Sequence, residues 1–220
     1  MNKVLSSIIL LACVFLSGCV LAAKLGTPGK DEQIVPAEFK FDSYKEGKIA
    51  IVVRSGAADQ QSQTISLYVD FAVRNMLIVN NKKTLKEKNF VPYKDYAKLK
   101  TDLVVIEGYS AVEIAKMLNA DAVLEIEMSD CRIEVLSGTA YYEGTLSLSA
   151  MLYDVKSGSV LWPQDGFGKQ VSVSFDLDTT GRDGAMKRLA KTGGHCIARY
   201  LYDCPMSKFK IPEETAAVQW

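Results

Sequence analysis

The chain has 220 residues, with 26 basic and 26 acidic side chains and one histidine. This balance excludes the basic excess that nucleic-acid-binding proteins use against the phosphate backbone, so no nucleic acid partner is expected. The length suits one folded domain with a substantial hydrophobic core and a shorter extension.

Residues 1–18 have the pattern of a bacterial secretory signal. Lys3 is followed by an apolar run from Val4 to Phe15 and then by Leu-Ser-Gly before Cys19. The run is too short to span a bilayer, which takes about 20 apolar residues in a helix. The tetrapeptide ending at Cys19 resembles a lipobox, where a bacterial lipoprotein receives a diacylglycerol thioether. The alternative is an ordinary signal peptide with an incidental cysteine.

A lipobox predicts that Cys19 is the first mature residue and carries the acyl chains, palmitate among them. Three chains would hold the protein firmly, because each buried methylene contributes about 0.8 kcal/mol. Val20 stands where aspartate favours retention at the inner membrane in enterobacterial lipoproteins. We therefore predict a lipid-anchored protein of the outer membrane that faces the periplasm. Lys3 leaves with the signal, so 25 of the 26 basic residues remain.

Residues 19–46 mix glycine, proline and charges without a period, and they predict a tether that becomes ordered near Phe39 and Phe41. The domain is predicted over residues 47–205. It opens with a short apolar run from Lys48 to Val53, which is typical of a buried central strand.

Two helices are predicted next. The first runs from about Thr64 to Leu77, and its apolar positions recur at helical spacing: Ile65, Val69, Ala72 and Met76. The second runs from Ser110 to about Leu118. It begins with a capping box, in which Ser110 and Glu113 each satisfy a backbone donor of the other residue.

A lysine-rich stretch, residues 82–100, separates the two helices. It holds seven lysines against Glu87 and Asp95. Such a run is more typical of a solvated face than of a contact with anionic lipid or glycan headgroups. Within it, residues 90–93 predict a short edge strand, because Pro92 cannot donate a hydrogen bond to a central one.

An antiparallel meander follows, in which each strand has one apolar and one polar face. The strands are predicted over residues 121–128, 141–153 and 160–175, the last interrupted at residues 163–168. Gly158 suits the turn between the second and third strands.

The last helix is predicted from about Gly184 to Asp203. Its buried stripe contains Met186, Leu189, Gly193, Ile197, Tyr200 and Cys204. Glycines inside a helix cost about 1 kcal/mol each, so Gly193 and Gly194 indicate close packing against a neighbour or a break in the helix. Residues 206–220 predict a C-terminal tail, with Trp220 as its candidate docking residue.

Three cysteines remain after Cys13 and Cys19: Cys131, Cys196 and Cys204. One disulfide and one thiol would allow three pairings, and three small buried hydrophobic residues are the alternative. Cys196 and Cys204 would be about 12 Å apart in one continuous helix, too far to join. Pro205, however, indicates that the chain turns there.

The sequence does not predict an enzyme, a cofactor site or a metal site. His195 shares a helix face with Lys191 and Arg199, which is typical of a solvated surface residue. Glu125 and Glu127 lie side by side on one strand face, as general acid–base pairs do, but any solvent-facing strand gives this alternation. The pattern Gly-Phe-Gly at residues 166–168 lacks the lysine and serine of a phosphate-binding loop.

One block of sequence carries a family resemblance. It combines the capped helix with Ile114-Ala115-Lys116, the strand Asn-Ala-Asp-Ala-Val-Leu at residues 119–124, and the hairpin Leu-Tyr-Asp-Val-Lys-Ser-Gly-Ser-Val-Leu-Trp at residues 152–162. This block resembles envelope lipoproteins related to the curli-secretion protein CsgG and to LpoB, an activator of penicillin-binding proteins. It is most similar to smaller, poorly characterised lipoproteins that share the domain.

The resemblance implies a three-layer α/β domain with a mixed, largely antiparallel sheet and helices packed on it. It implies no catalytic residues. The function it favours is a non-enzymatic interaction module for an envelope transport, secretion or wall-building complex, with a protein partner. The alternative is a subunit of a homo-oligomeric outer-membrane export channel. The channel is disfavoured because the apolar face of residues 141–153 has to cover the core and no second hairpin remains.

Overall fold

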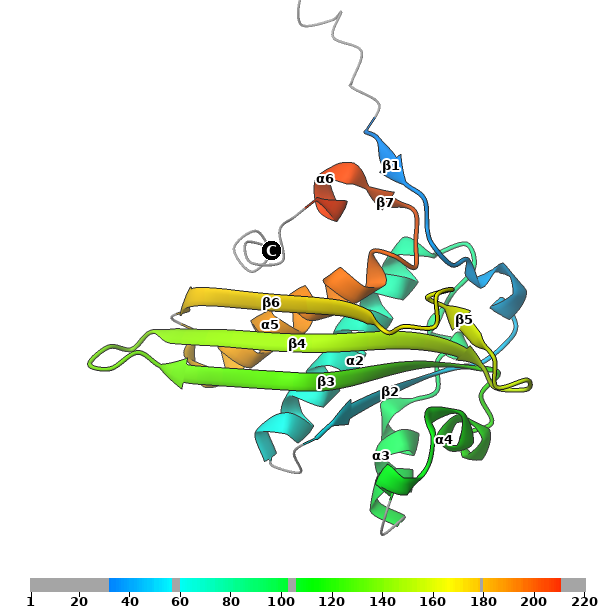
Figure 1. Cartoon of the computed structure of the whole chain (residues 1–220), viewed down its shortest axis with the longest axis horizontal. Coiled ribbons are helices and arrows are strands. Elements are labelled where there is room, and N and C mark those ends of the chain that lie inside the picture. Colours follow the sequence, from blue (N-terminus) through cyan, green and yellow to red (C-terminus); the bar gives the residue numbers. More distant parts are fainter. Residues whose placement is uncertain (1–31, 57–59, 103–105, 179, 211–220) are drawn as a thin grey trace, which may run out of the picture. The chain divides into compact units, whose positions relative to one another are not determined.

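The computed structural model describes residues 32–56, 60–102, 106–178 and 180–210, and its folded unit begins at Ile34. A five-stranded sheet lies at the centre of this unit. Its strands are β2 (Ile49–Ser55), β3 (Ala122–Val135), β4 (Tyr142–Asp154), β5 (Val160–Trp162) and β6 (Lys169–Asp178). β2 is parallel to β3, and the other pairings are antiparallel, with β5 and β6 both paired to β4 (Figure 1). The predicted mixed, largely antiparallel α/β fold is confirmed.

Helices lie on both faces of the sheet, which gives the three layers that the resemblance implies. α2 (Gln60–Asn80) and α5 (Gly181–Ala198) cover one face. α3 (Tyr93–Asp102) and α4 (Ala111–Met117) pack against β2 and β3 on the other. The short elements are β1 (Ile34–Val35), η1 (Phe41–Tyr44), η2 (Glu87–Asn89), η3 (Ile106–Gly108), β7 (Cys204–Pro205) and α6 (Met206–Phe209). β1 pairs with β7 in a separate antiparallel ladder.

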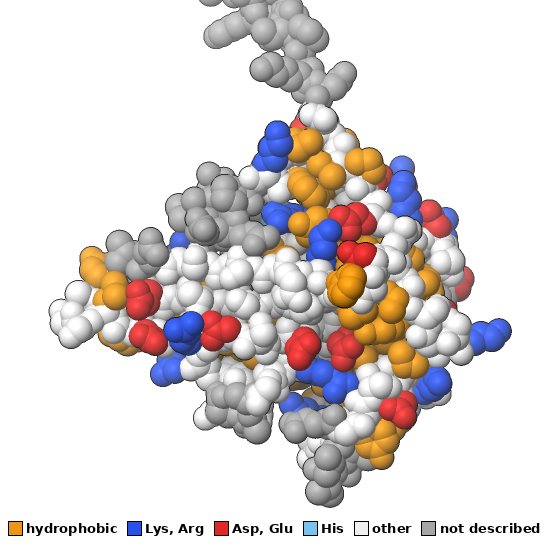
Figure 2. All heavy atoms as spheres, viewed as in Figure 1, with side chains coloured by type: hydrophobic (Ala, Val, Ile, Leu, Met, Phe, Trp, Pro, Cys, Tyr) orange, Lys and Arg blue, Asp and Glu red, His pale blue; other side chains and the backbone are white. Residues whose placement is uncertain are grey.

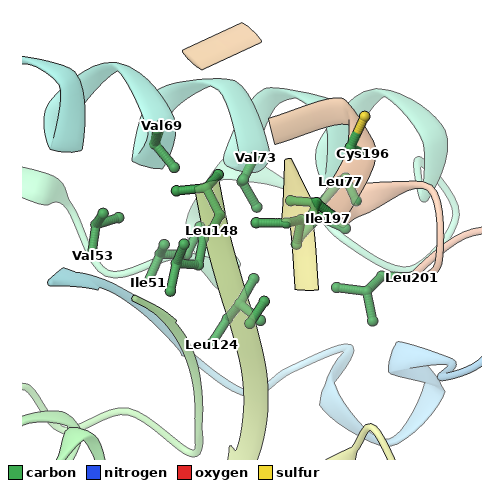
Figure 3. Packing of buried hydrophobic residues seen from close by; sticks show 14 of the residues in the cluster. Ile51, Val53, Val69, Val73, Leu77, Leu124, Leu148, Cys196, Ile197 and Leu201 are labelled. Carbon is green, nitrogen blue, oxygen red and sulfur yellow. The ribbon is translucent and has the colours of Figure 1, made fainter. Parts of the chain in front are cut away.

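The larger hydrophobic core lies between the sheet and the pair of helices α2 and α5. In Figure 3, Ile51 of β2, Leu124 of β3 and Leu148 of β4 gather with Val73 of α2 and Ile197 of α5. All five side chains are at most 3% exposed. Since burial of one such side chain contributes about 1.5–3 kcal/mol, this layer is the main source of stability.

β2 is buried, as predicted, but its predicted central position is wrong. It stands at the end of the strand order of the described sheet, where it pairs with β3. Helices cover both of its faces: Ile51 belongs to the core under α2 and α5, and Val52 to the core under α3 and α4. On the outer side, the Val91 N–H donates to the Ile49 carbonyl at 2.9 Å. An apolar run therefore identifies a buried strand without fixing its place in the sheet.

The alternation predicted for the meander is confirmed. Leu146, Leu148, Ala150 and Leu152 of β4 are fully buried, while Ser147, Ser149 and Met151 between them are partly exposed. The polar face over β4 and β6 is rich in serine and threonine, and in Figure 2 this part of the surface is largely white. The core under α3 and α4 lies on β2 and β3 and meets β4 near that strand's end, at Tyr153, so these helices do not extend over the polar face.

The helices differ from prediction mainly in their ends. α2 is longer than the predicted helix, and α5 ends at Ala198 rather than at Asp203. α3 was not predicted, since it is rich in lysine. Its two tyrosines and its leucine, Tyr93, Tyr96 and Leu99, are nevertheless spaced by three and pack into the second core. The capping box of α4 is present as predicted.

The ends of the folded unit also differ from the predicted boundaries. Residues 34–46, assigned to the tether, contribute β1 and η1, and Phe41 is only 2% exposed. Glu38 accepts a hydrogen bond of 2.7 Å from the indole of Trp162 and pairs with Lys169 at 2.8 Å. Within the predicted tail, residues 206–209 form α6. The signal segment, Cys19 and Trp220 lie outside the described residues.

Candidate docking groove

α2 has an unusual distribution of charge. Its 21 residues include two charged side chains, Asp70 and Arg74, and both point into the protein, with side-chain exposures of 3% and 7%. The Arg74 guanidinium binds both carboxylate oxygens of Asp70 at 3.1 Å and donates to the Val91 carbonyl at 2.9 Å. Burial raises the pKa of Asp70, and the charge of Arg74 opposes that shift. The solvent side of α2 therefore carries no charged residue.

In place of charges, the outer side of α2 exposes large apolar side chains. Leu67 is 38% exposed, Phe71 61% and Val79 56%. Leu67 and Phe71 are four residues apart, so they lie on one ridge of the helix surface. A solvated helix normally presents polar and charged residues there. This ridge therefore has the character of a surface that another molecule covers.

A groove of about 530 Å³ lies along this ridge, between α2 and α5. Its lining is mostly apolar, with two lysines contributed by α5: Leu67, Tyr68, Phe71, Ala72, Asn75, Met76, Lys187 and Lys191. The two helices pack closely because Gly194 of α5 lies against Ala72 of α2. The backbone thus brings an apolar wall and a basic rim together.

The rim of the groove carries an ordered group of polar side chains. Asp183 accepts hydrogen bonds from the Tyr68 hydroxyl at 2.6 Å and from Lys187 Nζ at 2.7 Å. The hydrogen bond from Lys187, followed by that from Tyr68, lowers the pKa of Asp183, and its partner Asp183 raises the pKa of Lys187. The pair stays charged near neutral pH. Lys191, one turn further along α5, adds a second positive charge to the lining.

Two of the eight lining residues, Ala72 and Met76, were predicted as apolar positions of an amphipathic helix. They are only partly buried, and they line the groove. The fully buried positions are Val73 and Leu77. The sequence does contain a signal for an uncharged outer surface. Within residues 60–80 the two charged residues, Asp70 and Arg74, are four apart, as in an ion pair inside one helix, and the other positions are uncharged.

The residues weighed for catalysis are not brought together. Glu125 of β3 forms an ion pair with Arg54 of β2 at 2.8 Å, and Glu127 lines a smaller hollow that Arg54 also lines. His195 lies on α5, across the sheet from both. Among the described residues, no three histidine, cysteine, aspartate or glutamate side chains are grouped so that they could hold a metal ion.

The prediction of a solvated His195 is wrong, because its side chain is 1% exposed. α6 folds back over this face of α5, so that the His195 ring nitrogen Nε2 lies 3.3 Å from the Lys208 carbonyl and Arg199 donates to the Phe209 carbonyl at 3.0 Å. Burial lowers the pKa of His195, and the positive charges of Arg199 and Lys208 act in the same direction. The spacing of four residues between Lys191 and His195 gives no indication that α6 covers this face of α5.

The cysteines occupy three different elements. Cys131 is half-buried on β3, Cys196 is buried on α5 and Cys204 is buried on β7. Cys204 therefore does not continue the helix of Cys196, in agreement with the turn that Pro205 indicates. Pairing among the three stays a prediction.

No helix within the described part of the chain combines the length and the apolar character that crossing a membrane requires.

Comparison with known proteins gives similarity at the level of the fold. No family profile and no curated protein matches this chain. Lipoprotein GNA1162 from Neisseria meningitidis is 15% identical with a TM-score of 0.41, over 69% of this chain and 98% of that one. The PelC dodecamer from Paraburkholderia phytofirmans is 13% identical with a TM-score of 0.42, over 77% and 96%. The LpoB C-terminal domain from Salmonella enterica is 19% identical with a TM-score of 0.32, over 69% and 90%. The chain is structurally similar to these proteins at low sequence identity.

Proposed function

We propose that this chain is a non-enzymatic lipoprotein of the outer membrane that docks a protein partner in the groove between α2 and α5. The role fits an accessory subunit of an envelope transport, secretion or wall-building complex. The observation that carries the proposal is the outer side of α2, which has no charge and exposes Phe71 at 61%.

The lining of the groove favours docking over catalysis. Its lining residues include no serine, cysteine or histidine nucleophile, and the carboxylate at its rim, Asp183, is bound by Tyr68 and Lys187. What it offers is apolar area with two ammonium groups at the edge, as protein-binding surfaces with a dry centre and a polar rim do. A partner that fits presents an apolar side chain for the groove and polar groups for its rim, where Lys187 and Lys191 lie.

The proposed anchor would hold this groove near the membrane. Only 14 residues separate Cys19 from Ile34, where the folded unit begins. Even at full extension, a connection of that length reaches at most about 50 Å. That limit suits a partner that is itself in or close to the same membrane.

Photo-crosslinking in intact cells tests the proposal. A benzophenone amino acid replaces Phe71, and the matched control carries it at Lys156, an exposed turn residue between β4 and β5. The expected result is one defined protein adduct at Phe71 and none at Lys156. Equal labelling at both positions, or no adduct at Phe71, would contradict docking in this groove.

A further inference from the structure

We propose that the occupant of the groove is a second copy of this chain, related by a two-fold axis that passes over α2 between Leu67 and Phe71. This inference rests on the proposed function, since it names the partner of the same groove. It goes further by fixing which residues meet.

Along the exposed ridge of α2, the order of residue types is the same from either end. Its members are four residues apart and each is exposed: Gln63, Leu67, Phe71 and Asn75. Two apolar side chains at the centre are flanked on each side by a carboxamide. An antiparallel copy centred between Leu67 and Phe71 places Leu67 opposite Phe71 of the second copy, and Gln63 opposite Asn75. Apolar groups then meet apolar groups, and amides meet amides.

A closed two-fold interface requires one patch that complements itself, with a projection and a recess on the same surface. Phe71 supplies the projection, at 61% exposed, and the groove beside it supplies the recess. Under the two-fold operation each Phe71 enters the groove of the other copy. The two contacts form together, so one substitution at this position removes both.

The charges permit this approach. The outer side of α2 brings no charged side chain to the axis, because Asp70 and Arg74 are buried and bound to each other. Lys187 and Lys191 stand at the rim, on α5. An antiparallel crossing of the two copies of α2 confines the contact to the turns around residues 63–75.

The register predicts a specific exchange experiment. Leu67→Lys and Phe71→Glu should each yield monomers, because every dimer would bury two charges without partners. Mixing the two variants should restore the dimer, since Lys at 67 in one copy then faces Glu at 71 in the other while the second contact stays Phe71 on Leu67. Val79→Glu, 56% exposed on the same helix but outside the pairing, is the control that should leave the dimer intact.

The oligomeric state is measured by analytical ultracentrifugation of the chain from residue 20, with circular dichroism to confirm that each variant is folded. We expect at least a tenfold weaker dimer for either single variant and recovery to within threefold on mixing. Two single variants that remain monomeric when mixed, or dimers that persist in both, would overturn the assigned register.

The crosslinker at Phe71 in the lipid-anchored chain separates this inference from the proposed function. An adduct of twice the chain mass supports the second copy. An adduct with a different protein keeps the docking function and overturns the dimer, and a ladder above the dimer overturns the two-fold axis. The absence of any adduct overturns both.

Discussion

Gly194 of α5 lies directly against Ala72 of α2: a Cβ built on Gly194 would stand 2.8 Å from the Ala72 Cβ and 3.1 Å from the Val73 backbone nitrogen. Real Cβ atoms essentially never approach another atom below 3.0 Å. The glycine therefore allows the two helices to touch through their backbones. The same contact brings the two helices that form the groove close together, so the packing of α2 on α5 and the shape of the candidate site have one cause.

Gly194→Ala should destabilise the fold. Overpacking of this kind costs about 1–3 kcal/mol, of which the better helix propensity of alanine returns at most about 1 kcal/mol. The free energy of unfolding, measured by urea titration, should fall accordingly. The matched control is Gly56→Ala, because a Cβ at Gly56 has nothing within 4 Å. A Gly194→Ala variant as stable as the wild type would mean that α2 and α5 can separate without loss.

The buried pair of Asp70 and Arg74 should make stability sensitive to the loss of either partner. Arg74→Met leaves a carboxylate buried without its counter-charge, which typically costs about 3–5 kcal/mol. Burial already raises the pKa of Asp70, and loss of Arg74 should raise it further. A raised pKa means that the folded state holds its proton longer than the unfolded chain does. Stability contributed by this group is therefore present at low pH and lost as the pH rises.

It follows that Arg74→Met should lose more stability between pH 4 and pH 7 than the wild type does, as measured by urea unfolding across that range. The double variant Asp70→Leu/Arg74→Met is the control, because replacement of both partners by apolar groups removes the buried charge. It should be closer to the wild type at pH 7 than Arg74→Met is. A pH-independent loss in Arg74→Met would show that the pKa of Asp70 in the folded protein is not raised above that of the unfolded chain, and it would contradict this prediction.

The parts of the fold that could be predicted are those set by short-range periodicity. Alternation along β3 and β4 determines which side chains face the core, so Leu146, Leu148 and Glu127 are found where the sequence puts them. The place of β2 in the sheet could not be predicted, because Val91, about forty residues later, covers its edge. No local pattern around Ile49 reports that contact.

The site was harder to predict than the fold, for the same reason. An outward apolar residue such as Phe71 and an inward one such as Val73 look alike in the sequence until the direction of the helix is known. The position of Asp70 and Arg74 supplies that direction only if a buried ion pair is assumed. The prediction for His195 was wrong in the opposite direction. Its helix face is polar, which is typical of an exposed face, yet α6 covers it.

His195 should make the protein less stable in mild acid. Its pKa is lowered by burial, so the folded state takes up a proton at lower pH than the unfolded chain, whose histidine titrates near pH 6.5. The stability from the neutral ring is present above about pH 6.5 and is lost as the pH falls through the lower folded-state pKa. Substitution His195→Gln should flatten the dependence of the unfolding free energy on pH between 7.5 and 5.5.

The chain has one histidine, so an untagged protein gives one set of imidazole resonances, and its NMR titration measures this pKa directly. A midpoint below 6.5 agrees with burial under α6. A midpoint at or above 6.5, together with an unchanged slope in His195→Gln, would contradict the assignment.

Cys19 is the residue on which the proposed location depends. Cys19→Ala should abolish acylation, because the thioether needs the sulfur, and the chain should then be found soluble or as an uncleaved precursor. The measurement is incorporation of a palmitate analogue, together with membrane fractionation and the mass of the product. Cys131→Ala, which changes a cysteine inside the folded unit, is the control and should be acylated normally. Unchanged labelling and unchanged fractionation of Cys19→Ala would eliminate the lipobox, and the 14-residue connection to Ile34 would then no longer place the groove beside a membrane.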